Sequence, residues 1–306
     1  LCQTLGRPGP QRVIDAIENN HITNCPITPA DAKRAEQIYG KDIAYLKGKT
    51  TANTATPHLV DHVHAPLPPD ITAQHQAVTL CADIFYVLDL TFSITISRNI
   101  RYISCRHLPD RNKGTIKASL AADIQLYRDR GFTPTAVHGD GEYHPLRNSF
   151  PGVHFDICAV EDHVPEAERA IRTIKETIRA TIHGMPYKRI PRVMVKALVA
   201  LAANSHNMFP HPDGVSQHLS PSNIVTGKPK PDFNTHKLEF GAYAQVYDGT
   251  SNDTKSRSLG AIALNPTNSA NGNYYFLSLA TGKIIHRRSW LELPISDATI
   301  SRVEAI

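Results

Sequence analysis

Three acidic residues stand in contexts that could bring them to one metal site. Asp83 lies in an apolar, strand-like run, Asp140 ends a second such run, and Glu168 opens a helical segment. Two aspartates on strands and a glutamate on a following helix can hold a pair of divalent ions, and such pairs promote in-line attack on phosphodiesters. We therefore expect Asp83, Asp140 and Glu168 to bind two Mg²⁺ or Mn²⁺ ions and to be the catalytic residues of a polynucleotidyl transferase.

Each context also has a plainer interpretation. A glutamate four residues before an arginine, as Glu168 precedes Arg172, stabilises a solvated helix surface. An aspartate between two glycines, like Asp140, is typical of a turn. Asp83 is harder to explain in this way, because a carboxylate inside an apolar strand costs free energy unless a cation or several donors satisfy it. The combination of the three contexts favours the metal site.

The helix that carries Glu168 also presents cations. At 100° per residue one narrow stripe contains a carboxylate and three cations, namely Glu168, Arg172, Lys175 and Arg179. An adjacent stripe is apolar and should pack on a sheet: Ile171, Ile174, Ile178 and Ile182. Cations that follow a metal ligand along a helix suit a line of DNA phosphates. We predict that Arg172, Lys175 and Arg179 contact DNA.

Other acidic residues compete for these roles. Glu166 lies about 160° around the helix from Glu168, and the helix dipole explains a glutamate in a first turn. Glu142, two residues after Asp140, is a weaker rival. Asp89 borders an apparent turn, so we interpret it as a turn residue or a neighbour of the metal ligands.

Zinc and phosphate-loop chemistry have little support. The 16 histidines show no paired His–Cys spacing of the kind that binds zinc, so we expect no zinc. We interpret most of these histidines as surface or linker residues, for example the cluster of His58, His62 and His64. His138 and His163 could lie near the acidic site and touch substrate or water. Lys47-Gly-Lys-Thr-Thr51 lacks the upstream glycine and preceding strand of a phosphate-binding loop.

Composition agrees with an ordinary globular protein. The 306 residues are enough for two or three modules, and 41% are hydrophobic and 20% charged. A net charge of +5 permits nucleic-acid binding. No run approaches the ~20 apolar residues that span a membrane, and no signal peptide is visible. The first residue is Leu1, so we expect a piece of a longer polyprotein.

Cysteine usage indicates a reducing compartment. The five cysteines are scattered, and Cys81, Cys105 and Cys158 fall in apolar runs, where we expect small buried side chains.

Hydrophobic periodicity predicts the domains. Residues 1–60 should form a small helical segment with a linker, where Thr28 caps a helix that starts at Pro29. Residues 70–212 should form a catalytic core in the order βββ-α-β-β-α-α, a mixed sheet covered by helices. Within it we expect strands at 77–88, 91–98, 100–107, 133–139 and 153–160, and helices at 114–130, 165–183 and 192–208. A connector at 213–237 should lead to a β-rich module at 238–295.

Several motifs of the chain occur in an order that is known from one family. They are Ala82-Asp83-Ile84, His138-Gly-Asp-Gly-Glu-Tyr143, His163-Val-Pro-Glu-Ala-Glu-Arg-Ala-Ile-Arg-Thr-Ile-Lys-Glu176, Leu219-Ser-Pro-Ser-Asn-Ile-Val-Thr-Gly227, Phe240-Gly-Ala-Tyr243, Gly272-Asn-Tyr-Tyr-Phe276 and Thr281-Gly-Lys-Ile-Ile285. In this respect the chain resembles the integrase region of copia-type (Pseudoviridae-like) LTR retrotransposon polyproteins over nearly its whole length.

The resemblance implies a ribonuclease-H-like catalytic core with an Asp-Asp-Glu triad, after a pre-integrase segment and before a β-rich tail. It implies 3′-end processing and strand transfer on double-stranded DNA by a homo-oligomer, inside the cell and in the nucleus, without a membrane partner. It also implies that Arg172 and Lys175 contact DNA.

The chain departs from the family pattern in two places. The first 60 residues contain no Cys-x-x-Cys, and Glu168 follows Asp140 by 28 positions, which is shorter than usual. A trimmed loop explains the short interval without moving the triad. If that explanation fails, the active site is degenerate, and the chain is a catalytically inactive nucleic-acid-binding remnant. A third alternative is a nuclease of the same fold that cleaves without joining.

Overall fold

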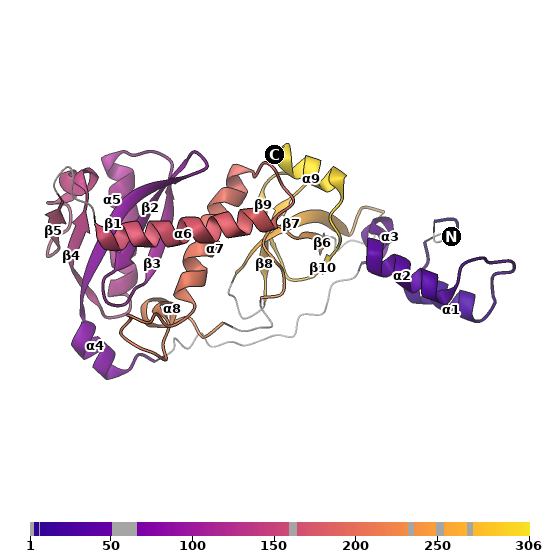
Figure 1. The fold of residues 1–306 in the computed structure, drawn as a ribbon, viewed down its shortest axis with the longest axis horizontal. Helices are drawn as coiled ribbons and strands as arrows, with labels where there is room; N and C mark the ends of the chain where they lie inside the picture. Colours follow the sequence, from indigo (N-terminus) through magenta and orange to yellow (C-terminus); the bar gives the residue numbers. More distant parts are fainter. Residues whose placement is uncertain are drawn as a thin grey trace. The chain divides into compact units, whose positions relative to one another are not determined.

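The computed structural model describes residues 3–5, 7–50, 66–158, 164–231, 236–248, 254–267 and 272–306 (Figure 1). The chain divides into two compact units. One comprises residues 60–185 and 194–232, and the other comprises 1–59, 186–193 and 233–306. Within the described ranges no helix is both long and apolar enough to cross a membrane.

A five-stranded mixed sheet, in the order β3-β2-β1-β4-β5, forms the centre of the first unit. Its strands are β1 (Ala77–Val87), β2 (Leu90–Ser97), β3 (Ile103–Leu108), β4 (Thr133–Gly139) and β5 (His154–Ile157). The first three strands form an antiparallel meander, while β4 is parallel to β1 and β5 is parallel to β4. This order and these directions are those of the ribonuclease-H-like fold, so the expected fold class is confirmed.

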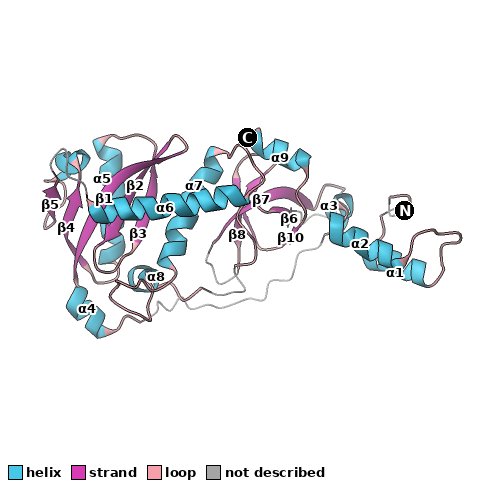
Figure 2. Ribbon diagram, viewed as in Figure 1, coloured by secondary structure: helices cyan, strands magenta, loops and turns pink. Residues whose placement is uncertain are grey.

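Helices cover both faces of this sheet. They are α4 (Pro69–His75), α5 (Lys113–Arg128), the 3₁₀ helix η1 (Gly141–Leu146), α6 (Pro165–Gly184), α7 (Arg192–Asn207) and α8 (Pro221–Thr226). Leu80 of β1 packs in one apolar cluster with Leu120 and Ile124 of α5. Figure 2 shows α6 crossing the sheet. Its charged Glu166 acts electrostatically on Cys81, which points away from Leu80 because neighbouring strand residues alternate between faces.

Residues with positive φ form the turns between the first three strands. The turn between β1 and β2 consists of Leu88 and Asp89, which have φ values of 44° and 64°. Asp89 is therefore a turn residue, in line with the first of its two interpretations. The strand expected from residue 100 begins only at Ile103, because Arg101 (φ 65°) continues the preceding turn and donates its N–H to the carbonyl of Ser97.

A buried carboxylate fastens α5 to β2 and β3. Asp123 is 1% exposed, and its oxygens accept hydrogen bonds from Thr95 Oγ1 (2.9 Å), Ser104 Oγ (2.6 Å) and Arg106 Nε (2.7 Å). Three donors compensate the cost of burying this charge. The helix α8 lies in the segment expected as a connector, and its Ile224 and Val225 are buried in the apolar cluster.

The second unit contains a five-stranded antiparallel sheet in the order β10-β6-β7-β8-β9. The strands are β6 (Tyr243–Tyr247), β7 (Ser258–Pro266), β8 (Tyr274–Ser278), β9 (Ile284–Arg287) and β10 (Trp290–Glu292). Tyr274, Phe276 and Trp290 pack at its centre, with ring centroids 4.9–6.2 Å apart. The expected β-rich C-terminal sheet is present.

The same unit also holds helices from both ends of the chain. They are α1 (Pro10–Glu18), α2 (Pro29–Tyr39), α3 (Ile43–Lys49) and α9 (Asp297–Glu304). Thr28 caps α2 as expected, through a hydrogen bond with Asp31 N–H, and Pro29 is the first helical residue.

Candidate active site

Asp83 lies on β1, and Asp140 directly follows the end of β4, the parallel strand that is paired with β1. Cys81 of β1 is paired with His138 of β4, and each aspartate follows its paired residue by two positions. Since side chains two apart on a strand share a face, both carboxylates stand on the face that carries Cys81 and His138. Both aspartates are half-buried. The sheet therefore brings together two of the three residues predicted to bind metal.

Short-range hydrogen bonds orient the two carboxylates. Oδ1 of Asp83 accepts the N–H of Ile84 at 2.6 Å. Oδ1 of Asp140 accepts the N–H of Glu142 at 3.1 Å and so caps η1. Each contact satisfies part of a carboxylate.

Tyr143 is a buried neighbour of both aspartates. Its buried hydroxyl donates to the backbone oxygen of Asp83 at 3.3 Å. Burial, and then the charges of Asp140 and Asp83, raise the pKa of Tyr143. A Cβ atom at Gly139 would lie 2.9 Å from Cδ2 of Tyr143, so the glycine lets the ring pack against the end of β4. Tyr143 and Gly139 are thus functional-site residues that the sequence signalled only as part of a motif.

The electrostatics of Asp140 suit a cation. Burial raises the pKa of Asp140, and the nearby positive charge of Arg111 opposes this shift. A half-buried carboxylate that is disfavoured in its charged form is stabilised by a divalent ion, and oxygen donors are those that Mg²⁺ and Mn²⁺ prefer. The two aspartates therefore fit the metal ions expected from the sequence.

The third predicted ligand, Glu168, lies in the first turn of α6, where its side chain is exposed. Its neighbour Glu166 accepts a hydrogen bond from Arg98 Nε at 2.9 Å. Burial opposes ionisation of Glu166, but a hydrogen bond from its own backbone N–H and the nearby Arg98 lower its pKa overall. Across the described residues, no three His, Cys, Asp or Glu side chains gather closely enough to hold a metal. The role of Glu168 stays a prediction.

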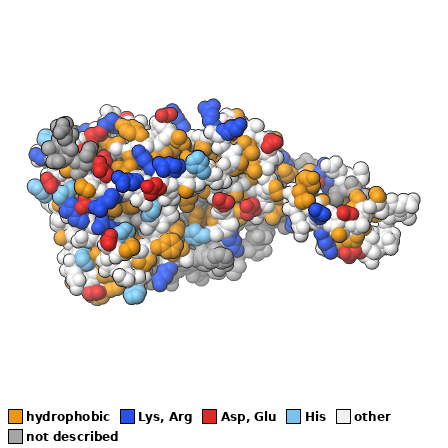
Figure 3. Space-filling view, viewed as in Figure 1, with side chains coloured by type: hydrophobic (Ala, Val, Ile, Leu, Met, Phe, Trp, Pro, Cys, Tyr) orange, Lys and Arg blue, Asp and Glu red, His pale blue; other side chains and the backbone are white. Residues whose placement is uncertain are grey.

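The predicted cationic surface lies on the solvent side of α6. Arg172, Lys175 and Arg179 are exposed, whereas Ile174 and Ile178 are buried. Figure 3 shows Lys and Arg side chains gathered along α6. The helix therefore offers the three cations to a ligand; that the ligand is DNA stays a prediction.

Arg111 is a site residue that sequence reasoning missed. It lies between β3 and α5, where its Nε donates to Glu142 Oε2 at 3.2 Å and Nη2 forms an ion pair with Glu142 Oε1. Its Nη1 donates to the hydroxyl of Tyr86 at 2.8 Å. In the sequence this arginine stands in a polar stretch typical of a loop, and no local pattern links it to Glu142, which lies 31 residues later.

His138 lies on the same face as the aspartates, and its Nδ1 is 3.0 Å from Oδ2 of Asp156 on β5. The expectation that it lies near the acidic site is consistent with this position. His163, His58, His62 and His64, together with Cys2, lie outside the described residues.

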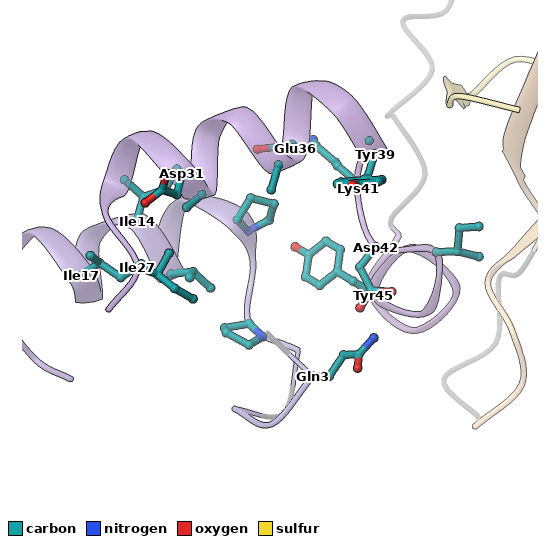
Figure 4. A pocket seen from close by; sticks show the side chains of 17 residues that line it. Gln3, Ile14, Ile17, Ile27, Asp31, Glu36, Tyr39, Lys41, Asp42 and Tyr45 are labelled. Atoms are coloured by element: carbon teal, nitrogen blue, oxygen red, sulfur yellow. The ribbon is translucent and has the colours of Figure 1, made fainter. Parts of the chain in front are cut away.

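A cavity of about 730 Å³ lies among the N-terminal helices, in the other unit (Figure 4). Ile14 and Ile17 of α1, Ala35 of α2 and Tyr45 of α3 are among its mainly apolar lining residues. None of the predicted site residues lines it.

Searches against protein-family models and curated proteins gave no match. Among solved structures, the chain is similar to the catalytic core domain of BIV integrase, with 17% identity and a TM-score of 0.36 over 48% of this chain and 93% of that one. It is also similar to the HTLV-2 integrase catalytic core domain in complex with magnesium. The trimeric and dimeric forms are each 13% identical, with TM-scores of 0.36 over 48% of this chain and 95% and 94% of theirs. The fold assignment rests on the strand order and pairing described above.

Proposed function

We propose that this chain is the integrase of a copia-type retrotransposon, a polynucleotidyl transferase that processes 3′ ends and joins them to double-stranded DNA. One observation carries the proposal: Asp83 on β1 and Asp140 just past the end of β4 each follow by two positions the paired residues Cys81 and His138 of a ribonuclease-H-like sheet. The order of the sequence motifs supports the copia-type assignment. Assembly as a homo-oligomer and action in the nucleus belong to the same proposal.

In this function Asp83, Asp140 and Glu168 hold two Mg²⁺ or Mn²⁺ ions. When bound there, such ions would supply Lewis-acid activation of the attacking hydroxyl and charge stabilisation of the leaving oxygen. Tyr143 holds the Asp83 backbone in place through its hydroxyl. The Glu142 N–H orients the carboxylate of Asp140. Arg172, Lys175 and Arg179 bind phosphates along α6, which supplies affinity without base specificity.

A reaction with labelled duplex ends of the parent element, target DNA and Mn²⁺ tests this function, with EDTA as the control. We expect longer, joined products that depend on the metal. Shortened products without joining would replace the integrase by a nuclease of the same fold.

The exposed position of Glu168 favours a second candidate, a DNA-binding remnant without catalysis. Such a protein would bind duplex DNA in a salt-dependent way, would form no product, and would bind equally well after Asp140→Asn. The same reaction, run beside a binding measurement, separates the two candidates.

A further inference from the structure

A half-exposed guanidinium stands at the same end of the sheet as the two aspartates. The side chain of Arg111 is 51% exposed, and its contacts with Glu142 and Tyr86 use three of the five N–H donors of an arginine. Among the described contacts, the other two N–H donors of Arg111 are available to a ligand.

Glu142 links this guanidinium to the acidic pair. Its carboxylate binds Arg111, while its backbone N–H donates to Oδ1 of Asp140. Tyr86, the second anchor, is on β1 three residues after Asp83. Arg111 therefore reaches the ends of β1 and β4 from the loop before α5: it contacts Tyr86 on the face of β1 opposite to Asp83, and it contacts Glu142 of η1, which begins directly after Asp140.

A phosphodiester that approaches Asp83, Asp140 and Glu142 meets three carboxylates and needs cations nearby. A planar guanidinium can bind phosphate through two parallel N–H donors. A partly exposed Arg–Glu pair contributes only about 0–1 kcal/mol, so a phosphate can replace Glu142 at little cost.

We propose that Arg111 binds a DNA backbone phosphate beside the Asp83–Asp140 pair, and that Glu142 and Tyr86 hold its guanidinium in place in the absence of DNA. The inference rests on the proposed function and adds a residue that positions the DNA next to the reacting centre.

Fluorescence anisotropy of a labelled DNA duplex, titrated with the full chain without divalent metal, tests the proposal. We expect Arg111→Gln to weaken binding about five- to tenfold near 0.1 M salt and to reduce the slope of log K against log[salt] by about 0.9, the value for one lost phosphate contact. Arg111→Lys should retain most of the slope. Glu142→Gln is the matched variant: it frees Arg111 and removes a negative charge, so binding should stay the same or become tighter.

An unchanged salt slope in Arg111→Gln overturns the proposal, provided that thermal unfolding shows a folded variant. Equal weakening in Arg111→Gln and Glu142→Gln also overturns it, because the ion pair would then act only by supporting the loop. If the wild-type chain binds DNA and Arg111→Gln keeps its salt slope, only this inference fails; if the wild-type chain binds no DNA, the proposed function fails too.

Discussion

At the scale of single residues, the parallel register of β1 and β4 determines the chemistry. Cys81 opposite His138 places Asp83 beside Asp140, and a slip of one residue on either strand would turn one carboxylate to the opposite face. Gly139 and Tyr143 then close the site from one side.

Asp140 should make stability depend on pH. Burial raises its pKa, so the folded chain binds the proton more tightly than the unfolded chain. The resulting stabilisation is complete below the unfolded pKa of about 3.9 and is lost as pH rises through the folded pKa. Asparagine cannot ionise, so Asp140→Asn in EDTA should be more stable than wild type at pH 7, by less than about 1 kcal/mol because solvent screens a half-buried group.

Thermal unfolding of both proteins between pH 3 and pH 8, each with and without Mn²⁺, measures this difference. The extra stability of Asp140→Asn over wild type should vanish toward pH 3. Saturating Mn²⁺ should stabilise the wild-type chain only. A variant that is less stable than wild type at pH 7 in EDTA would show that burial does not penalise this carboxylate.

At the scale of elements, the first turn of α6 presents two glutamates with different partners. Glu166 is bound to Arg98, whereas Glu168 is exposed at the start of the cationic stripe.

We expect Glu168→Gln to lower strand transfer at least about a hundredfold, as for the loss of a metal ligand, with little change in stability. Glu166→Gln should keep activity and lose about 1 kcal/mol of unfolding free energy. Strand-transfer rates and melting temperatures of both variants test this prediction. If Glu166→Gln loses activity and Glu168→Gln keeps it, Glu166 is the metal ligand.

The attachment of α5 to the sheet gives a separate prediction. Asp123→Ala leaves Arg106, Thr95 and Ser104 without their common acceptor, so we expect a loss of about 3 kcal/mol. Asp129, the exposed residue directly after the last residue of α5, is the matched control, and its alanine variant should change stability by less than about 0.5 kcal/mol. Urea unfolding measures both; equal effects would contradict a special role of the Asp123 network.

At the scale of the whole molecule, periodicity and turn residues predicted the mixed sheet, its helices and the β-rich sheet, because these signals are local. The contacts of Arg111 with Glu142, and of Asp123 with two strands, were not predicted, since they depend on which loops and faces meet after folding. The helix α8 was missed because six residues carry too short a pattern. Asp83 was singled out because a carboxylate in an apolar strand is costly, whereas Asp140 between two glycines had the signal of a turn residue; the role of both as metal ligands stays a prediction.

The most direct measurement is a strand-transfer assay in Mn²⁺ that compares wild type with Asp83→Asn, Asp140→Asn and Asp156→Asn. Asp156 is the control, because it is an exposed aspartate on the adjacent strand, paired with His138. Wild type and Asp156→Asn should join DNA ends, while the other two variants should lose at least about a hundredfold in rate. Joining by Asp140→Asn at the wild-type rate would contradict a metal site at this pair of aspartates.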